Sequence, residues 1–144
     1  QIPSEFKYRT CQVRTQGNPY AHAILRGSVD VYGNNIPNYH YEDLIRFHDM
    51  YLAQNLKNPA VIVDSNHSNS GKNYLEQIRI VKEVVDNIRH CDKIRSLVKG
   101  FLIESYIEDG AQQPGGDEYG KSITDPCLGW EKTKDLLLRV ADKL

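Results

Sequence analysis

The sequence is poor in cysteine, has no long hydrophobic run and favours neither sign of charge. Its three cysteines, Cys11, Cys91 and Cys127, are an odd number without C-x-x-C spacing. This excludes a disulfide scaffold and predicts free thiols in a reducing compartment, the cytoplasm. No apolar stretch approaches the ~20 residues that cross a bilayer, which argues against a membrane protein. The net charge is −1, with 18 Lys and Arg against 19 Asp and Glu, so a nucleic-acid partner is not expected.

The phosphate-binding motif G-x-x-x-x-G-K-[ST] is also absent, although Lys72 and Lys121 each follow a glycine. What is present is the composition of a folded domain, since 40% of the 144 residues are hydrophobic and 26% are charged. No linker or low-complexity segment divides the chain. We therefore expect one α/β unit over residues 1–144.

Short apolar segments alternate with amphipathic ones. Strands are predicted at residues 20–25, 60–63 and 100–103, and the last two are uninterrupted apolar runs typical of buried strands. Apolar residues at helical spacing predict three helices, which are an N-terminal one capped by Asn38, one at 73–90 and one at 130–141. Strands that alternate with helices predict a parallel sheet with right-handed crossovers. In front of it, loose alternation before the turn Gly17-Asn18-Pro19 predicts a β-hairpin at residues 5–17.

The residues that follow the three strands form a pattern. Arg26 follows the first strand, Asp64 and His67 follow the second, and Glu104 follows the third. Parallel α/β folds bind ligands at the carboxyl ends of their strands. An arginine there suits a phosphate or carboxylate, and His67 with Glu104 suits a divalent metal. Asp125, in the loop after the last strand, is a candidate for a third hard ligand.

Each of these residues also has an ordinary structural interpretation. Arg26 alone is a common loop cation, and His67 lies among Ser and Asn residues that cap helices. Asp125 precedes Pro126, where it could start a turn or cap the last helix. Glu104 directly follows four apolar strand residues, where an unpaired carboxylate is costly, so it favours a function most clearly.

At these residues the sequence resembles the C-terminal half of type I DAHP synthase, where DAHP is 3-deoxy-D-arabino-heptulosonate 7-phosphate. The similar motifs are Leu25-Arg26-Gly27, DSNHSNSGK at 64–72, Glu104-Ser105 and YGKSITD at 119–125, which continues as CLGWE at 127–131. The motifs are ordered, correctly spaced and spread over nearly the whole chain. The last one is very specific to that family.

The resemblance implies a fold and a reaction. The fold is the C-terminal part of a (β/α)8 TIM barrel, with about three βα units preceded by the β-hairpin at 5–17; a complete barrel takes ~250 residues. The family condenses phosphoenolpyruvate with erythrose 4-phosphate and releases phosphate, the first step of the shikimate pathway. It needs a divalent metal, for which Mn, Fe, Co and Zn are the candidates. The hairpin resembles one that contributes to an aromatic amino-acid effector site.

Residue by residue, the resemblance assigns roles to four positions. His67, Glu104 and Asp125 match three metal ligands of the family. Arg26 matches an arginine that binds phosphoenolpyruvate, and His67 also matches a residue close enough to that substrate to assist the reaction. The family's fourth ligand, a cysteine, and its Lys-Pro-Arg-Thr-Ser loop for erythrose 4-phosphate have no counterpart here and belong to strands upstream of Gln1.

Three alternatives follow for this chain. The leading one is a transferase fragment, inactive alone, that forms a homo-oligomer or pairs with a missing N-terminal half, because a partial barrel has open sheet edges and an exposed inner face. The second is a non-catalytic fragment or a phosphate- or metal-binding module that acts through assembly. The third is an independent flavodoxin-like binding domain, which would need a self-contained sheet.

Overall fold

A three-stranded parallel sheet forms the centre of the computed structural model, which describes all residues 1–144. Its strands are β3 (Ala23–Leu25), β6 (Val61–Asp64) and β7 (Val98–Leu102), in the order β3-β6-β7. The chain is thus α/β with a parallel sheet, as predicted. The strand boundaries differ from those predicted, since β3 is shorter than 20–25 and β7 is displaced towards the N-terminus from 100–103.

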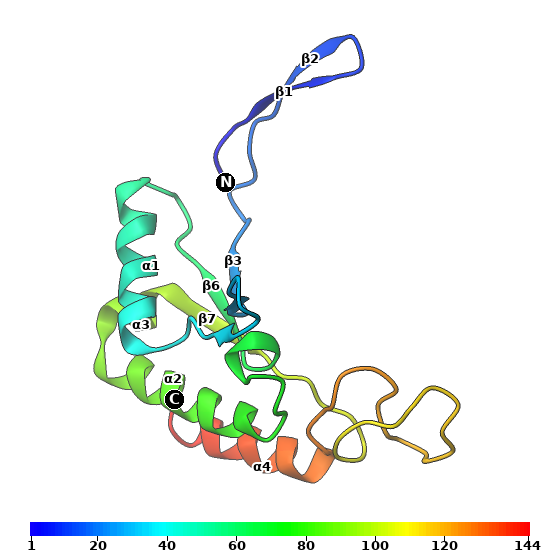
Figure 1. The fold of residues 1–144 in the computed structure, drawn as a ribbon. Helices are drawn as coiled ribbons and strands as arrows, with labels where there is room; N and C mark the ends of the chain where they lie inside the picture. The colour runs from blue at the N-terminus through cyan, green and yellow to red at the C-terminus, as the bar shows by residue number, and fades with distance from the viewer.

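Helices cover one face of this sheet. They are α1 (Tyr41–Ala53), α2 (Glu76–His90), α3 (Asp92–Leu97) and α4 (Trp130–Ala141). Figure 1 shows α1 and α3 beside β6 and β7, with α2 and α4 below them. The main core between these elements consists of Leu25, Tyr39, Leu44, Val61, Val63, Ile80, Val84, Ile94, Leu97 and Val98. None of the helices is both long and apolar enough to cross a membrane.

The predicted helix boundaries need correction. Asn38 does not cap α1, whose N-cap residue is His40; the Asn38 side chain instead accepts the N–H of Gly27 at 2.8 Å. The second helix begins at Glu76 rather than at residue 73, because the preceding residues form turns. The short helix α3 was not predicted, since only the extended backbone of Cys91 separates it from α2.

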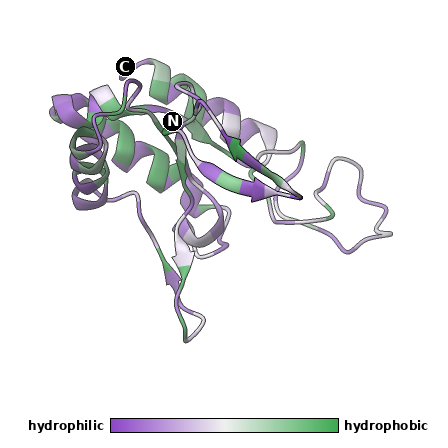
Figure 2. Cartoon of the chain, turned by 90° about the horizontal axis from the view of Figure 1, so that it is seen from above, coloured by the Kyte–Doolittle hydropathy of each residue, from purple (hydrophilic) through white to green (hydrophobic).

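The helical spacing of apolar residues predicts that Leu52, Trp130 and Leu137 face inward, but the structure leaves all three about half exposed. For α4 the reason is that it packs against α2, where Leu136 joins Val81 and Val85 in a second small core. Figure 2 shows hydrophobic segments gathered in the body of the fold, whereas the long loop that precedes α4 is mostly hydrophilic.

The second face of the sheet is uncovered. Ile24 is 48% exposed and Leu102 is 44% exposed, whereas the neighbouring Leu25, which points to the helices, is 2% exposed. In the register of the sheet, Ile24 lies beside Ile62 and Leu102 beside Asp64. Ile24, Ile62 and Leu102 define this uncovered face. Asp64 lies next to it, at the carboxyl end of β6.

Two hairpins lie outside the sheet, one before β3 and one between β3 and β6 in sequence. Strands β1 (Glu5–Tyr8) and β2 (Cys11–Arg14) pair antiparallel and project away from the body of the chain (Figure 1). Strands β4 (Ser28–Val29) and β5 (Asn35–Ile36) form a second, very short hairpin beyond β3, where a loop was predicted. Two-residue strands leave no alternating pattern in the sequence, so this hairpin could not be foreseen.

Candidate metal centre

The loop after β6 is held in a fixed shape by its own side chains. It contains a single 3₁₀ turn, η1 (His67–Asn69), in which His67 takes a left-handed φ of 48° that is uncommon outside glycine. Asn69 donates from Nδ2 to the carbonyls of Leu25 and Asp64 at 2.9 and 2.8 Å, which ties the ends of β3 and β6 together. Its Oδ1 accepts the N–H of Asn38. The loop is therefore anchored independently of the side chains that point into the site.

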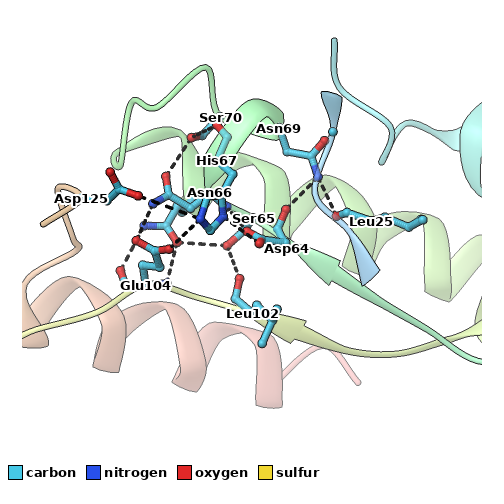
Figure 3. Close-up of polar contacts among 12 residues, drawn as sticks. Leu25, Asp64, Ser65, Asn66, His67, Asn69, Ser70, Leu102, Glu104 and Asp125 are labelled. Carbon is cyan, nitrogen blue, oxygen red and sulfur yellow. Dashed lines mark hydrogen bonds and ion pairs between the residues drawn. The ribbon is translucent and has the colours of Figure 1, made fainter. Parts of the chain in front are cut away.

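Three potential metal ligands converge at the carboxyl ends of β6 and β7 (Figure 3). His67 Nε2 lies 3.3 Å from Glu104 Oε1 and 4.0 Å from Asp125 Oδ2. One ligand atom from each of the three residues lies within 4.8 Å of the other two. Two carboxylates and an imidazole form a donor set that fits a divalent cation such as Mn²⁺, Fe²⁺, Co²⁺ or Zn²⁺. A cation here would also offset the repulsion between the two carboxylates.

A network of hydrogen bonds holds His67 and Glu104 in position. Asp64 accepts from His67 Nδ1 at 2.8 Å, and Asn66 Nδ2 donates to Glu104 Oε2 at 2.9 Å. The fully buried Gln77 of α2 bonds both backbone groups of Glu104, accepting its N–H and donating to its carbonyl. The network holds Glu104 just past the end of β7, where the chain leaves the sheet.

Of these supporting residues, sequence reasoning placed Asp64 at a strand end but missed Asn66 and Gln77. A signal for Gln77 existed, because it is a polar residue on the apolar stripe of α2, between Tyr74 and Val81. A buried amide on such a stripe requires partners of its own. Asn66 gave no comparable signal among so many small polar neighbours.

The sequence of this chain matches the profile of the DAHP synthetase I family over residues 3–138. The chain belongs to the DAHP synthetase I family. This excludes the flavodoxin-like alternative.

Named relatives of the family match the chain over most of its length. The Trp-sensitive phospho-2-dehydro-3-deoxyheptonate aldolase of Enterobacter agglomerans is 38% identical over 132 residues, 90% of this chain and 35% of that enzyme. The Tyr-sensitive enzyme of the same organism is 38% identical over 133 residues, 90% of this chain and 58% of that protein. A solved phospho-2-dehydro-3-deoxyheptonate aldolase from Francisella tularensis SCHU S4 is 28% identical with a TM-score of 0.79, over 99% of this chain and 41% of its own. The chain therefore spans between about a third and three fifths of these relatives.

The other residues singled out from the sequence do not join the cluster of His67, Glu104 and Asp125. Arg26 is exposed at the end of β3, and its guanidinium forms no hydrogen bond or ion pair. Cys127 lies near Asp125, whose carbonyl accepts from its thiol at 3.3 Å. Burial raises the pKa of the Cys127 thiol. The three converging side chains include no cysteine.

Proposed function

We propose that this chain forms the C-terminal part of the (β/α)8 barrel of a DAHP synthase and carries most of its metal centre. The observation that carries the proposal is the convergence of His67, Glu104 and Asp125 at the ends of adjacent parallel strands. The motifs that resemble the family and the geometry of the cluster both support these three residues.

The incomplete sheet supports the barrel assignment. The order β3-β6-β7 leaves β3 and β7 as open edges, and the uncovered face exposes Ile24 and Leu102. In a closed barrel that face would be filled by side chains from the other strands. The partner we propose is therefore an N-terminal barrel half or, in its absence, a second copy of this chain.

In the proposed reaction, the complete barrel joins phosphoenolpyruvate to erythrose 4-phosphate and releases phosphate. The free guanidinium of Arg26 would bind the phosphate or carboxylate of phosphoenolpyruvate. His67, Glu104 and Asp125 would hold the divalent metal, which supplies a Lewis acid for the aldehyde carbonyl of erythrose 4-phosphate. We propose that the partly exposed side chain of His67 contacts phosphoenolpyruvate as well.

The relatives also suggest an effector. The two relatives from Enterobacter agglomerans are named as a Trp-sensitive and a Tyr-sensitive enzyme. We propose that the β1–β2 hairpin, which exposes Phe6 and Tyr8, contributes to a site for an aromatic amino acid. Saturation-transfer NMR with Phe, Tyr and Trp would detect such binding, and loss of the signal in Phe6→Ala would locate it.

The activity is tested with a chimera, because the isolated chain lacks half of the proposed site. This chain replaces the matching 135 residues of the Trp-sensitive enzyme of Escherichia coli K12, to which it is 34% identical. We expect Mn²⁺-dependent condensation by the chimera, none by the isolated chain, and loss of turnover in Glu104→Gln. A folded chimera that binds Mn²⁺ without turnover would instead favour the non-catalytic, assembly-based alternative.

A further inference from the structure

Asp64 occupies the side of the His67 ring that faces away from the proposed metal. Its Oδ2 lies 2.8 Å from His67 Nδ1, and its Oδ1 accepts the N–H of Asn66 at 2.9 Å. Asp64 is only 3% exposed and does not belong to the converging ligand set. We propose that Asp64 is a positioning residue for the metal site, an inference that rests on the proposed function. Asp64 keeps the His67 proton on Nδ1, so that the Nε2 lone pair faces the metal.

The hydrogen-bonding roles follow from the chemistry of the two groups. A carboxylate only accepts, so His67 Nδ1 must be the donor in the contact with Asp64. In a neutral imidazole the other nitrogen then carries the lone pair, and Nε2 is the atom that points to Glu104 and Asp125. Glu104 could compete for the proton from the Nε2 side, but its contact is longer, at 3.3 Å, and its side chain is far more exposed than that of Asp64.

Asn66 positions the second ligand in the same way. Ser70 Oγ donates to Asn66 Oδ1 at 2.9 Å, which leaves the NH₂ of Asn66 to face Glu104. That NH₂ donates to Glu104 Oε2, so Oε1 is the carboxylate oxygen directed towards His67. His67 and Glu104 therefore each have one polar side-chain atom fixed by a neighbouring side chain and the other free for a metal.

The left-handed backbone of His67 fits this role. A non-glycine residue in that region is strained and persists only where its surroundings hold it. Here the strained φ of 48° brings the ring of His67 between Asp64 and Glu104. Asn69 anchors the loop through the backbone carbonyl of Asp64, so changing the Asp64 carboxylate leaves that anchor in place.

The test uses the tautomer of His67 in the 144-residue chain. Two-bond ¹H–¹⁵N spectra of ¹⁵N-histidine-labelled protein are recorded without metal, well above the ordinary imidazole pKa of ~6.5, and His67→Gln assigns the signal. We expect the proton on Nδ1. A ring protonated at Nε2, alone or together with Nδ1, overturns the proposal, and this result needs no folded variant at Asp64.

The variant Asp64→Asn tests whether Asp64 determines the tautomer of His67. Its Oδ1 would keep the N–H of Asn66, so its NH₂ would donate to His67 Nδ1 and drive the proton to Nε2. We expect this tautomer and Mn²⁺ binding that is ~10–100-fold weaker. The matched control is Asp86→Asn, the same isosteric change at a carboxylate that pairs with Lys143 and lies outside the ligand cluster. It should keep the tautomer and the affinity for Mn²⁺.

The outcomes separate this inference from the proposed function. If the unaltered chain binds Mn²⁺ and Asp64→Asn binds it equally well, the positioning role is wrong and the metal site stands. If the unaltered chain binds no Mn²⁺ but His67 shows the Nδ1 proton and Asp64→Asn moves it, the metal site is wrong, and only the control of the His67 tautomer by Asp64 stands.

Discussion

At the scale of single residues, the site depends on charge at Glu104. Replacing its carboxylate by the amide in Glu104→Gln removes a negative ligand and places a second NH₂ group beside that of Asn66. We expect Mn²⁺ affinity to fall by at least about tenfold, as measured by isothermal titration calorimetry. Glu108→Gln is the control, because Glu108 is an exposed carboxylate of the following loop outside the cluster. An equal loss in both variants would mean that only overall charge matters.

Gly27 offers a second test at the same scale. It has a φ of 73°, and a Cβ there would lie 2.8 Å from Ser68 Cβ in the loop after β6. Gly33 has a φ of 87° but nothing within 4 Å of a Cβ. Alanine should therefore cost ~1 kcal/mol of backbone strain at both positions, while only Gly27→Ala displaces the loop. Urea unfolding and Mn²⁺ titration should show weaker metal binding in Gly27→Ala alone; similar binding by both variants would contradict the account.

At this scale the sequence foretold much of the site. His67 and Glu104 could be placed together because parallel strands end at one edge of a sheet, whatever the details of the loops. The hydrogen bonds by which Asn66 and Gln77 support Glu104 could not be predicted. They depend on side-chain directions that only the folded loop and α2 define. Arg26 was placed correctly at the end of β3, but whether it binds a substrate stays a prediction.

At the scale of elements, the long loop between β7 and α4 must be anchored for Asp125 to reach His67. Asp109 supplies one anchor, since it accepts the N–H of Gly129 at 2.6 Å and pairs with Lys132 of α4. Lys132, and then the N–H of Gly129, hold the pKa of Asp109 below its ordinary value. The carboxylate therefore stabilises the folded chain at neutral pH.

The pH dependence of this anchor has a defined sign. Because the pKa of Asp109 is lowered on folding, its contribution is present above the ordinary Asp value of ~3.9 and is lost as the pH falls through the lower, folded value. Asp109→Asn should thus unfold ~1 kcal/mol more easily in urea at neutral pH and lose this deficit in strong acid. Asp117→Asn, at an exposed position of the same loop, should match the unaltered chain at both pH values. A deficit that persists in acid would contradict the ionic anchor.

The helices and strands were predictable where the apolar residues follow one clear pattern along the sequence. The apolar run of β6 and the helical stripe of α2 identified both elements, although the start of α2 was placed too early. The six residues of α3 and the two-residue strands β4 and β5 were missed. Such short elements are stabilised by tertiary contacts rather than by a pattern of their own.

At the scale of the whole molecule, the uncovered face of the sheet is the dominant feature. Ile24 and Leu102 expose apolar surface beside two open strand edges, so the isolated chain should self-associate at micromolar concentration. The double change Ile24→Thr and Leu102→Thr should shift sedimentation towards the monomer. The double change Leu137→Thr and Leu138→Thr, at exposed positions of α4, should not. A stable monomer before any substitution would contradict the open-face interpretation.

The central claim is that this chain holds a divalent metal through His67, Glu104 and Asp125. Electron paramagnetic resonance during titration with Mn²⁺ tests it most directly, because it separates bound from free ion. The account predicts one Mn²⁺ per chain, with binding lost in His67→Gln and unchanged in His22→Gln, a substitution at an exposed histidine outside the cluster. Absence of binding, or equal binding by both variants, would contradict it.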